Sequence, residues 1–114
     1  MKNKLTILNL ILAILLFTSS CSKEEMYEVK IFGTDVCGLT SSLKNSCSKD
    51  GIAFNYVNID LNFENQKAFY QVVEKYNLGG GGPILLPVVL MTYKNKTSGI
   101  ERASIQQVKA FISQ

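Results

Sequence analysis

Cysteine is the residue type in this chain best suited to covalent chemistry, and Cys37 is the cysteine best placed for it. The sequence contains no histidine, which excludes imidazole from every catalytic or metal-binding scheme, and with it Ser-His-Asp and zinc-protease sites. A thiolate is the reactive form of cysteine, but an ordinary thiol with a pKa of about 8.5 is only slightly ionised at neutral pH. Cys37 therefore needs surroundings that lower its pKa.

The place of Cys37 in the chain supplies such surroundings. It comes after an alternating apolar segment, residues 26–32, which predicts a strand, and before residues 38–49, whose apolar side chains recur at helical spacing. The first turn of a helix has unpaired N–H groups and the positive end of the helix dipole, and both stabilise a sulfur anion. A helix over 38–49 is therefore expected to lower the pKa of Cys37.

Two neighbours of Cys37 are expected to act on its sulfur in opposite directions. Thr40 carries a hydroxyl that can donate a hydrogen bond to the thiolate, which favours ionisation. Asp35 is a like charge and raises the pKa of Cys37 if its carboxylate points inward, although it is equally interpreted as a solvated loop residue. We expect the effect of the helix to exceed that of Asp35, so that the pKa of Cys37 is modestly lowered.

Cys47 is excluded as a disulfide partner of Cys37. Ten helical residues at about 1.5 Å each place the two roughly 15 Å apart, whereas a disulfide needs Cα atoms about 4.4 to 6.8 Å apart. Cys47 falls on the helix face of Leu43, so we expect it to be a small buried hydrophobe. A mixed disulfide on Cys37 then needs an external thiol to resolve it.

The remaining pattern predicts an α/β domain over residues 27–114 with the order βαβαββα. The further elements are a strand over 53–59, a helix over 62–76, a strand over 87–92, its antiparallel partner over 97–100 and a last helix that opens with a capping box of Ser104 and Gln107. Phe63 and Phe69 are among the apolar side chains that the second helix offers for burial. The order predicts a four-stranded mixed sheet with helices on both faces.

The charge balance argues against a nucleic-acid partner. The chain has 12 basic and 9 acidic residues, and without Lys2 and Lys4, which lie in a segment expected to be cleaved, 10 basic residues remain against 9 acidic ones. No strongly basic surface is left for a nucleic acid. Four consecutive glycines, residues 79–82, lack the Lys-Ser/Thr pair of a phosphate-binding loop, so we expect a flexible connection there.

Residues 1–20 predict a secretory signal peptide. Lys2 and Lys4 precede an apolar run over 5–17, and small residues come directly before Cys21. The run has about 13 residues, whereas a bilayer-spanning helix needs about 20, which disfavours a permanent transmembrane anchor.

The junction at Cys21 resembles a bacterial lipobox, although Thr18 stands where lipoboxes usually carry leucine. The resemblance implies a lipid on Cys21, a short tether over residues 21–26 and a location at a membrane of the bacterial cell envelope. Ordinary signal cleavage, with Cys21 left free or in a disulfide, is the alternative.

The four residues CGLT at positions 37–40, placed between a strand and a helix, resemble the active-site motif of the thioredoxin and glutaredoxin superfamily. Pro87, at the start of a later strand, is the second landmark, and the resemblance covers residues 27–114. It implies a thioredoxin-like fold, with Cys37 as the nucleophile and Pro87 as a cis-proline that holds substrate backbone. An ordinary strand-start proline is the alternative interpretation of Pro87. Thr40 stands at the second cysteine of the dithiol motif, which makes the chain similar to monothiol glutaredoxins.

The function that this resemblance implies is thiol–disulfide exchange outside the cytoplasm. The substrate would be a protein or small-molecule disulfide, and an external thiol would be the reductant. The resemblance implies glutathione as a ligand, which glutaredoxins hold with a Gly-Gly and a following Asp after the last strand. Residues 98–101 keep only a trace of this glutathione signature, so we expect no cofactor. Iron–sulfur binding would need glutathione and a cytosolic setting. The competing hypothesis is a non-catalytic, membrane-tethered binding module in which Cys37 is vestigial.

Overall fold

The first strand, β1 (Tyr27–Gly33), is the centre on which the sheet is built. In the computed structural model, which describes residues 26–114, β1 pairs in parallel with β2 (Asn55–Asn58) and antiparallel with β3 (Val88–Tyr93). β4 (Lys96–Glu101) pairs antiparallel with β3, which gives the strand order β2-β1-β3-β4. The predicted α/β class and four-stranded mixed sheet are confirmed, and the arrangement is compatible with a thioredoxin-like fold.

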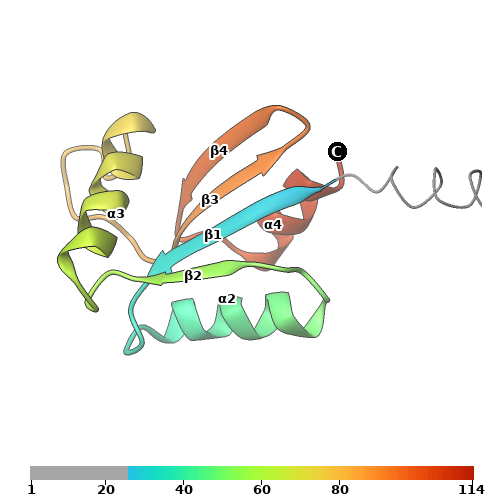
Figure 1. Cartoon of the computed structure of the whole chain (residues 1–114), viewed down its shortest axis with the longest axis horizontal. Helices are drawn as coiled ribbons and strands as arrows, with labels where there is room; N and C mark the ends of the chain where they lie inside the picture. The colour runs from blue at the N-terminus through green and yellow to red at the C-terminus, as the bar shows by residue number, and fades with distance from the viewer. Residues whose placement is uncertain (1–25) are drawn as a thin grey trace, which may run out of the picture.

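Helices cover both faces of this sheet, as predicted (Figure 1). α2 (Gly38–Lys49) and α4 (Ile105–Ile112) lie on one face, and α3 (Phe63–Lys75) lies on the other. Successive residues of a strand point to opposite faces, so the central strands supply both layers of core. The first layer contains Val29, Ile31, Leu43, Cys47, Val89, Met91 and Val108, and the second contains Phe32, Phe69, Val72 and Val88.

Local capping fixes where the helices begin. The Asn62 side chain accepts a hydrogen bond from the N–H of Asn65 at 2.9 Å and so caps α3. The predicted capping box at the start of α4 is present, with Ser104 and Gln107 each accepting a backbone N–H of the other. These bonds satisfy donors that the first turn of a helix leaves unpaired.

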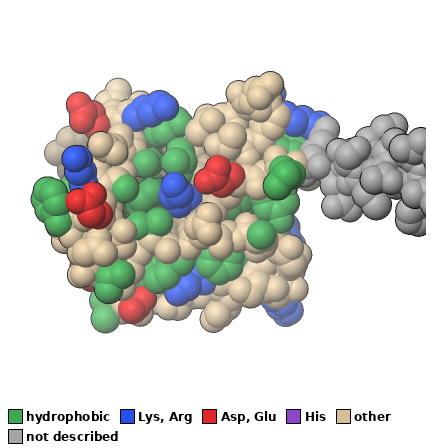
Figure 2. All heavy atoms as spheres, viewed as in Figure 1, with side chains coloured by type: hydrophobic (Ala, Val, Ile, Leu, Met, Phe, Trp, Pro, Cys, Tyr) green, Lys and Arg blue, Asp and Glu red, His purple; other side chains and the backbone are tan. Residues whose placement is uncertain are grey.

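Phe63 is exposed, so its predicted burial is wrong. The residue is 72% exposed, whereas Phe69 is 4% exposed. Phe63 lies six residues before Phe69, which at 3.6 residues per turn places it about 120° around the helix. Only the stripe that contains Phe69 and Val72 faces the sheet, and hydrophobic side chains reach the surface over the α3 end of the molecule (Figure 2).

The strand limits differ from the predicted ones by one or two residues. The segment over 53–59, rich in β-branched and aromatic residues, contributes only Asn55–Asn58 to the sheet. Before the strand begins, the N–H of Ala53 donates to the Tyr27 hydroxyl at 3.1 Å. β4 begins and ends one residue beyond the predicted 97–100.

The predicted signal peptide, the lipid site at Cys21 and all of the predicted tether except Met26 lie outside the residues that the structure describes. Between Met26 and Gln114, none of the helices has the length and apolar character needed to span a bilayer.

Gly33→Ala should destabilise the protein by about 1–3 kcal/mol, because a Cβ at position 33 would overlap the buried side chain of Thr40. Chemical denaturation measures the loss. Gly38→Ala is the matched control: a Cβ there meets no atom within 4 Å, so its stability should be unchanged or higher. Equal stabilities for Gly33→Ala and the unmodified protein would contradict this packing.

Candidate functional site

Cys37 lies at the junction between the end of β1 and the start of α2. Its N–H donates to the carbonyl of Thr34 at 3.2 Å, which closes the turn, and its own carbonyl accepts the N–H of Ser41 at 3.1 Å, which opens the helix. Cys37 is therefore the N-cap residue of α2, and its side chain makes no capping bond there. The residue is partly exposed and its thiol is free, so the sulfur is available for reaction.

Thr40 is the strongest influence on the Cys37 thiol. Its hydroxyl, followed by its backbone N–H, lowers the pKa of Cys37, and the N–H of Leu39 acts in the same direction against the opposing effect of burial. Thr40 is fully buried, and its Oγ1 has no hydrogen-bond partner in the part of the chain described. A neutral thiol is a weak acceptor, so this hydroxyl gains a strong partner when Cys37 ionises.

Arg102 is a functional candidate that the sequence patterns did not reveal. It lies in the connection between β4 and α4 with a φ of 44°, and its backbone N–H donates to the carbonyl of Leu85 at 3.1 Å. Its positive charge lowers the pKa of Cys37. The strand pairing would have indicated Arg102. Val88 lies opposite both Phe32 and Glu101, so β1 and β4 end at the same edge of the sheet.

Pro87 comes to this same edge. The Leu86–Pro87 peptide bond is cis, which is the geometry that the resemblance to thioredoxins implies for this position. Pro87 is buried, and its carbonyl accepts the N–H of Ala103 at 3.3 Å. This bond joins the start of β3 to the connection that carries Arg102. The role of Pro87 in holding a substrate stays a prediction.

Asp35 does not oppose the ionisation of Cys37. Its carboxylate accepts a hydrogen bond from the Tyr56 hydroxyl at 2.8 Å, and Asp35 is not among the groups that shift the pKa of Cys37. Burial, followed by Asp35, raises the pKa of Tyr56 to about 12. Lys44 Nζ lies 3.6 Å from the centre of the Tyr56 ring. The predicted repulsion is thus replaced by a hydrogen bond to a tyrosine that the sequence patterns did not single out.

Cys47 is buried among apolar side chains, as predicted. It is fully inaccessible and forms no disulfide. Burial, followed by the charge of Asp50, raises the pKa of the Cys47 thiol. Cys47 is therefore a poor nucleophile at neutral pH and a member of the core.

Glu101 and Gly99, which belong to the trace of the glutathione signature over residues 98–101, both make contacts within the fold. The Glu101 carboxylate accepts hydrogen bonds from the N–H of Leu85, at 3.0 Å, and from the N–H of Gly79. These two bonds lower the pKa of Glu101. A Cβ at Gly99 would lie 2.8 Å from ring atoms of Tyr76, so the close approach of that ring requires glycine. Both residues hold the glycine-rich connection and the end of α3 against β4.

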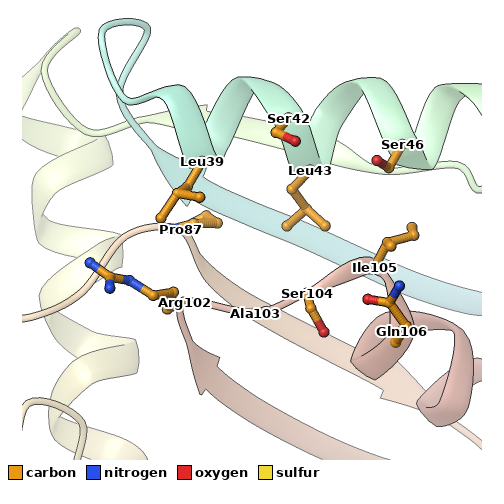
Figure 3. A pocket seen from close by; sticks show the side chains of 10 residues that line it. All are labelled: Leu39, Ser42, Leu43, Ser46, Pro87, Arg102, Ala103, Ser104, Ile105 and Gln106. Carbon is orange, nitrogen blue, oxygen red and sulfur yellow. The ribbon is translucent and has the colours of Figure 1, made fainter.

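A groove lies between α2 and the connection from β4 to α4, and one of its lining residues, Leu39, is two residues from Cys37 in the first turn of α2 (Figure 3). The groove has a volume of about 330 Å³. Leu39 and Pro87 face each other at one end, where Arg102 also lies, and Ile105 and Gln106 lie toward the other end. Its lining residues are Leu39, Ser42, Leu43, Ser46, Pro87, Arg102, Ala103, Ser104, Ile105 and Gln106.

No protein-family model matches the chain, and no curated protein matches it either. Among residues 26–114, no group of three or more cysteine and acidic side chains is placed to hold a metal ion. The interpretation of the site therefore rests on its geometry.

Thr40→Val should raise the pKa of Cys37, because it removes the hydroxyl that contributes most to lowering it. The pH at which alkylation by iodoacetamide reaches half its maximal rate should rise, and the rate at neutral pH should fall severalfold. Ser41→Ala is the matched control and should leave the profile unchanged. Valine replaces an unpaired buried hydroxyl with a methyl group, so stability should not fall. A Thr40→Val profile identical to the unmodified one would contradict the assigned role.

Proposed function

We propose that the protein carries out thiol–disulfide exchange as a monothiol, glutaredoxin-like protein, with Cys37 as the nucleophile. The observation that carries the proposal is a partly exposed thiol at a helix N-terminus whose pKa is lowered by Thr40, Leu39 and Arg102. A lowered pKa increases the thiolate fraction at neutral pH, and the thiolate is the attacking species. The cis-proline at position 87 and the groove beside it offer a place for the substrate.

The exchange begins when the Cys37 thiolate attacks one sulfur of a substrate disulfide. The substrate S–S bond breaks as the new S–S bond to Cys37 forms, and the departing thiolate takes a proton from water. Among residues 26–114 the other cysteine, Cys47, is buried in the core and cannot reach the mixed disulfide. An external thiol therefore attacks the mixed disulfide and releases the second substrate thiol, and another releases Cys37. In total, two external thiols are oxidised to a disulfide and the substrate is reduced to a dithiol.

The proposed exchange takes its electrons from the external thiol and needs no bound cofactor. Thr40 Oγ1 and the N–H groups of the first helical turn stabilise the thiolate before attack, and they stabilise it again when Cys37 is the leaving group. Arg102 adds a positive charge at the same place.

We further propose that the protein is exported and lipid-anchored through Cys21, with residues 1–20 as the signal peptide. The layout of two lysines, an apolar run and small residues before Cys21 supports this. The substrate and the external thiol would then lie in the cell envelope.

Cys37→Ser should abolish the reduction of a disulfide by an external thiol, because a hydroxyl cannot form the mixed disulfide. The assay follows reduction of bis(2-hydroxyethyl) disulfide under excess dithiothreitol, with the uncatalysed rate subtracted. Cys47→Ala is the matched control and should keep full activity. If the Cys37→Ser protein keeps its turnover, the nucleophile assignment is wrong. If the unmodified protein has no turnover but both forms retain the same protein partner in pull-down, the binding-module hypothesis holds instead.

Cys21→Ala should release the protein from the membrane fraction of bacterial cells, because it removes the site of lipid attachment. Metabolic labelling with a radioactive or alkyne-tagged fatty acid, followed by fractionation, tests this. The unmodified protein should be labelled, and Cys37→Ala, as control, should be labelled equally. Labelling that persists in Cys21→Ala would overturn the lipidation proposal.

A further inference from the structure

The groove between α2 and the connection before α4 combines an apolar floor with one charged side chain. Leu43, Pro87 and Ala103 are buried, and Leu39 is 49% exposed, so an apolar surface extends from α2 to the connection before α4. Ile105 adds a further apolar side chain, and three serines and Gln106 supply hydroxyl and amide groups. Of the residues that line the groove, Arg102 alone is charged. An occupant that matches this surface has apolar groups along most of its length and a negative charge at one end.

Arg102 has no ion-pair partner in the part of the chain described. Its acidic neighbour, Glu101, is engaged with the N–H groups of Gly79 and Leu85 on the glycine-rich connection. Figure 3 shows the Arg102 guanidinium extending past Pro87, away from Ile105 and Gln106. Val88 lies opposite both Phe32 of β1 and Glu101 of β4, so the connections that carry Cys37 and Arg102 leave the same edge of the sheet. A substrate sulfur that approaches Cys37 must therefore come to the Arg102 end of the groove.

The length of the groove distinguishes a polypeptide from a small disulfide. Leu39 and Ser46 line its two ends on α2, and seven helical residues at about 1.5 Å each separate them by roughly 10 Å. An extended chain rises about 3.3 Å per residue, so the groove accommodates about three residues on one side of a cystine. A small disulfide would leave the part near Ile105 empty.

We infer that the groove binds an extended segment of a protein disulfide substrate, in which a carboxylate beside the reacting cystine pairs with Arg102 and the next side chain packs between Leu43 and Ile105. This inference rests on the proposed exchange function and names its substrate class. Arg102 is thus a specificity-determining residue. The guanidinium suits the task because its planar donors match a carboxylate in two parallel hydrogen bonds.

Peptide mixed disulfides with 2-mercaptoethanol test this pairing. One peptide has the order Cys-Glu-Leu between alanines, its partner has glutamine for glutamate, and both are also made in the reverse order. We expect Cys37 to react about threefold faster with the glutamate peptide at low salt in at least one order. The preference should shrink with added salt, vanish in Arg102→Gln and persist in part in Arg102→Lys. Because both peptides meet the same thiol, the ratio of rates is independent of the effect of Arg102 on the Cys37 pKa.

Ser46→Glu tests occupation of the far end of the groove. It should slow the reaction with the leucine peptides more than the reaction with bis(2-hydroxyethyl) disulfide, because a carboxylate would enter the apolar part that only the longer substrate occupies. Ser48→Glu, at an exposed position of the same helix outside the groove, is the matched control. Equal slowing by both variants would overturn the groove assignment.

Equal rates for the glutamate and glutamine peptides, or a preference that survives in Arg102→Gln, would overturn the role of Arg102. Failure of the proposed exchange gives a different result, namely no reaction with any disulfide. The inference is then tested by binding alone, with serine in place of cysteine in the peptides and in Cys37→Ser. Tighter binding of the glutamate peptide in fluorescence polarisation supports the groove assignment, and equal binding refutes it.

Discussion

The contact between Thr40 and Gly33 is the constraint on which the site depends. A side chain at position 33 would overlap Thr40, so only glycine lets the first turn of α2 settle onto the end of β1. This packing places the Thr40 hydroxyl and the N–H groups of the first turn against the Cys37 sulfur. The buried hydroxyl costs stability while it lacks a partner, and the thiolate supplies one. Packing and reactivity are therefore linked through a single side chain.

The sheet gathers the rest of the site from distant parts of the chain. β1 and β4 run in the same direction on either side of β3, so the residues that follow β1 and β4 meet the residues that precede β3. Cys37, Pro87 and Arg102 occupy these three connections. The bonds from Arg102 to Leu85 and from Ala103 to Pro87 hold two of the connections together, so the groove has a fixed wall opposite α2.

The periodicity of the sequence predicted the features that depend on a few neighbouring residues. The features of the site that depend on which strands pair could not be predicted in this way. The element order, the burial of Cys47 and the capping box at Ser104 follow from patterns of a few residues, and all are present. The hydrogen bond between Tyr56 and Asp35 and the position of Arg102 depend on which strands are neighbours, which no local pattern encodes. Phe63 fits the apolar composition of its helix, but the narrow stripe that faces the sheet excludes it.

The direction of β1 relates the site to the proposed anchor. The described chain enters the sheet near Tyr27, and Cys37 follows the opposite end of that strand (Figure 1). Seven residues at about 3.3 Å each separate the two ends by roughly 20 Å. A lipid on Cys21 would attach the domain to the membrane by the Tyr27 end, and the domain would have to turn over to bring Cys37 to the bilayer. The fold therefore favours a substrate that approaches from the aqueous side, which agrees with the proposed binding of an extended polypeptide segment in the groove.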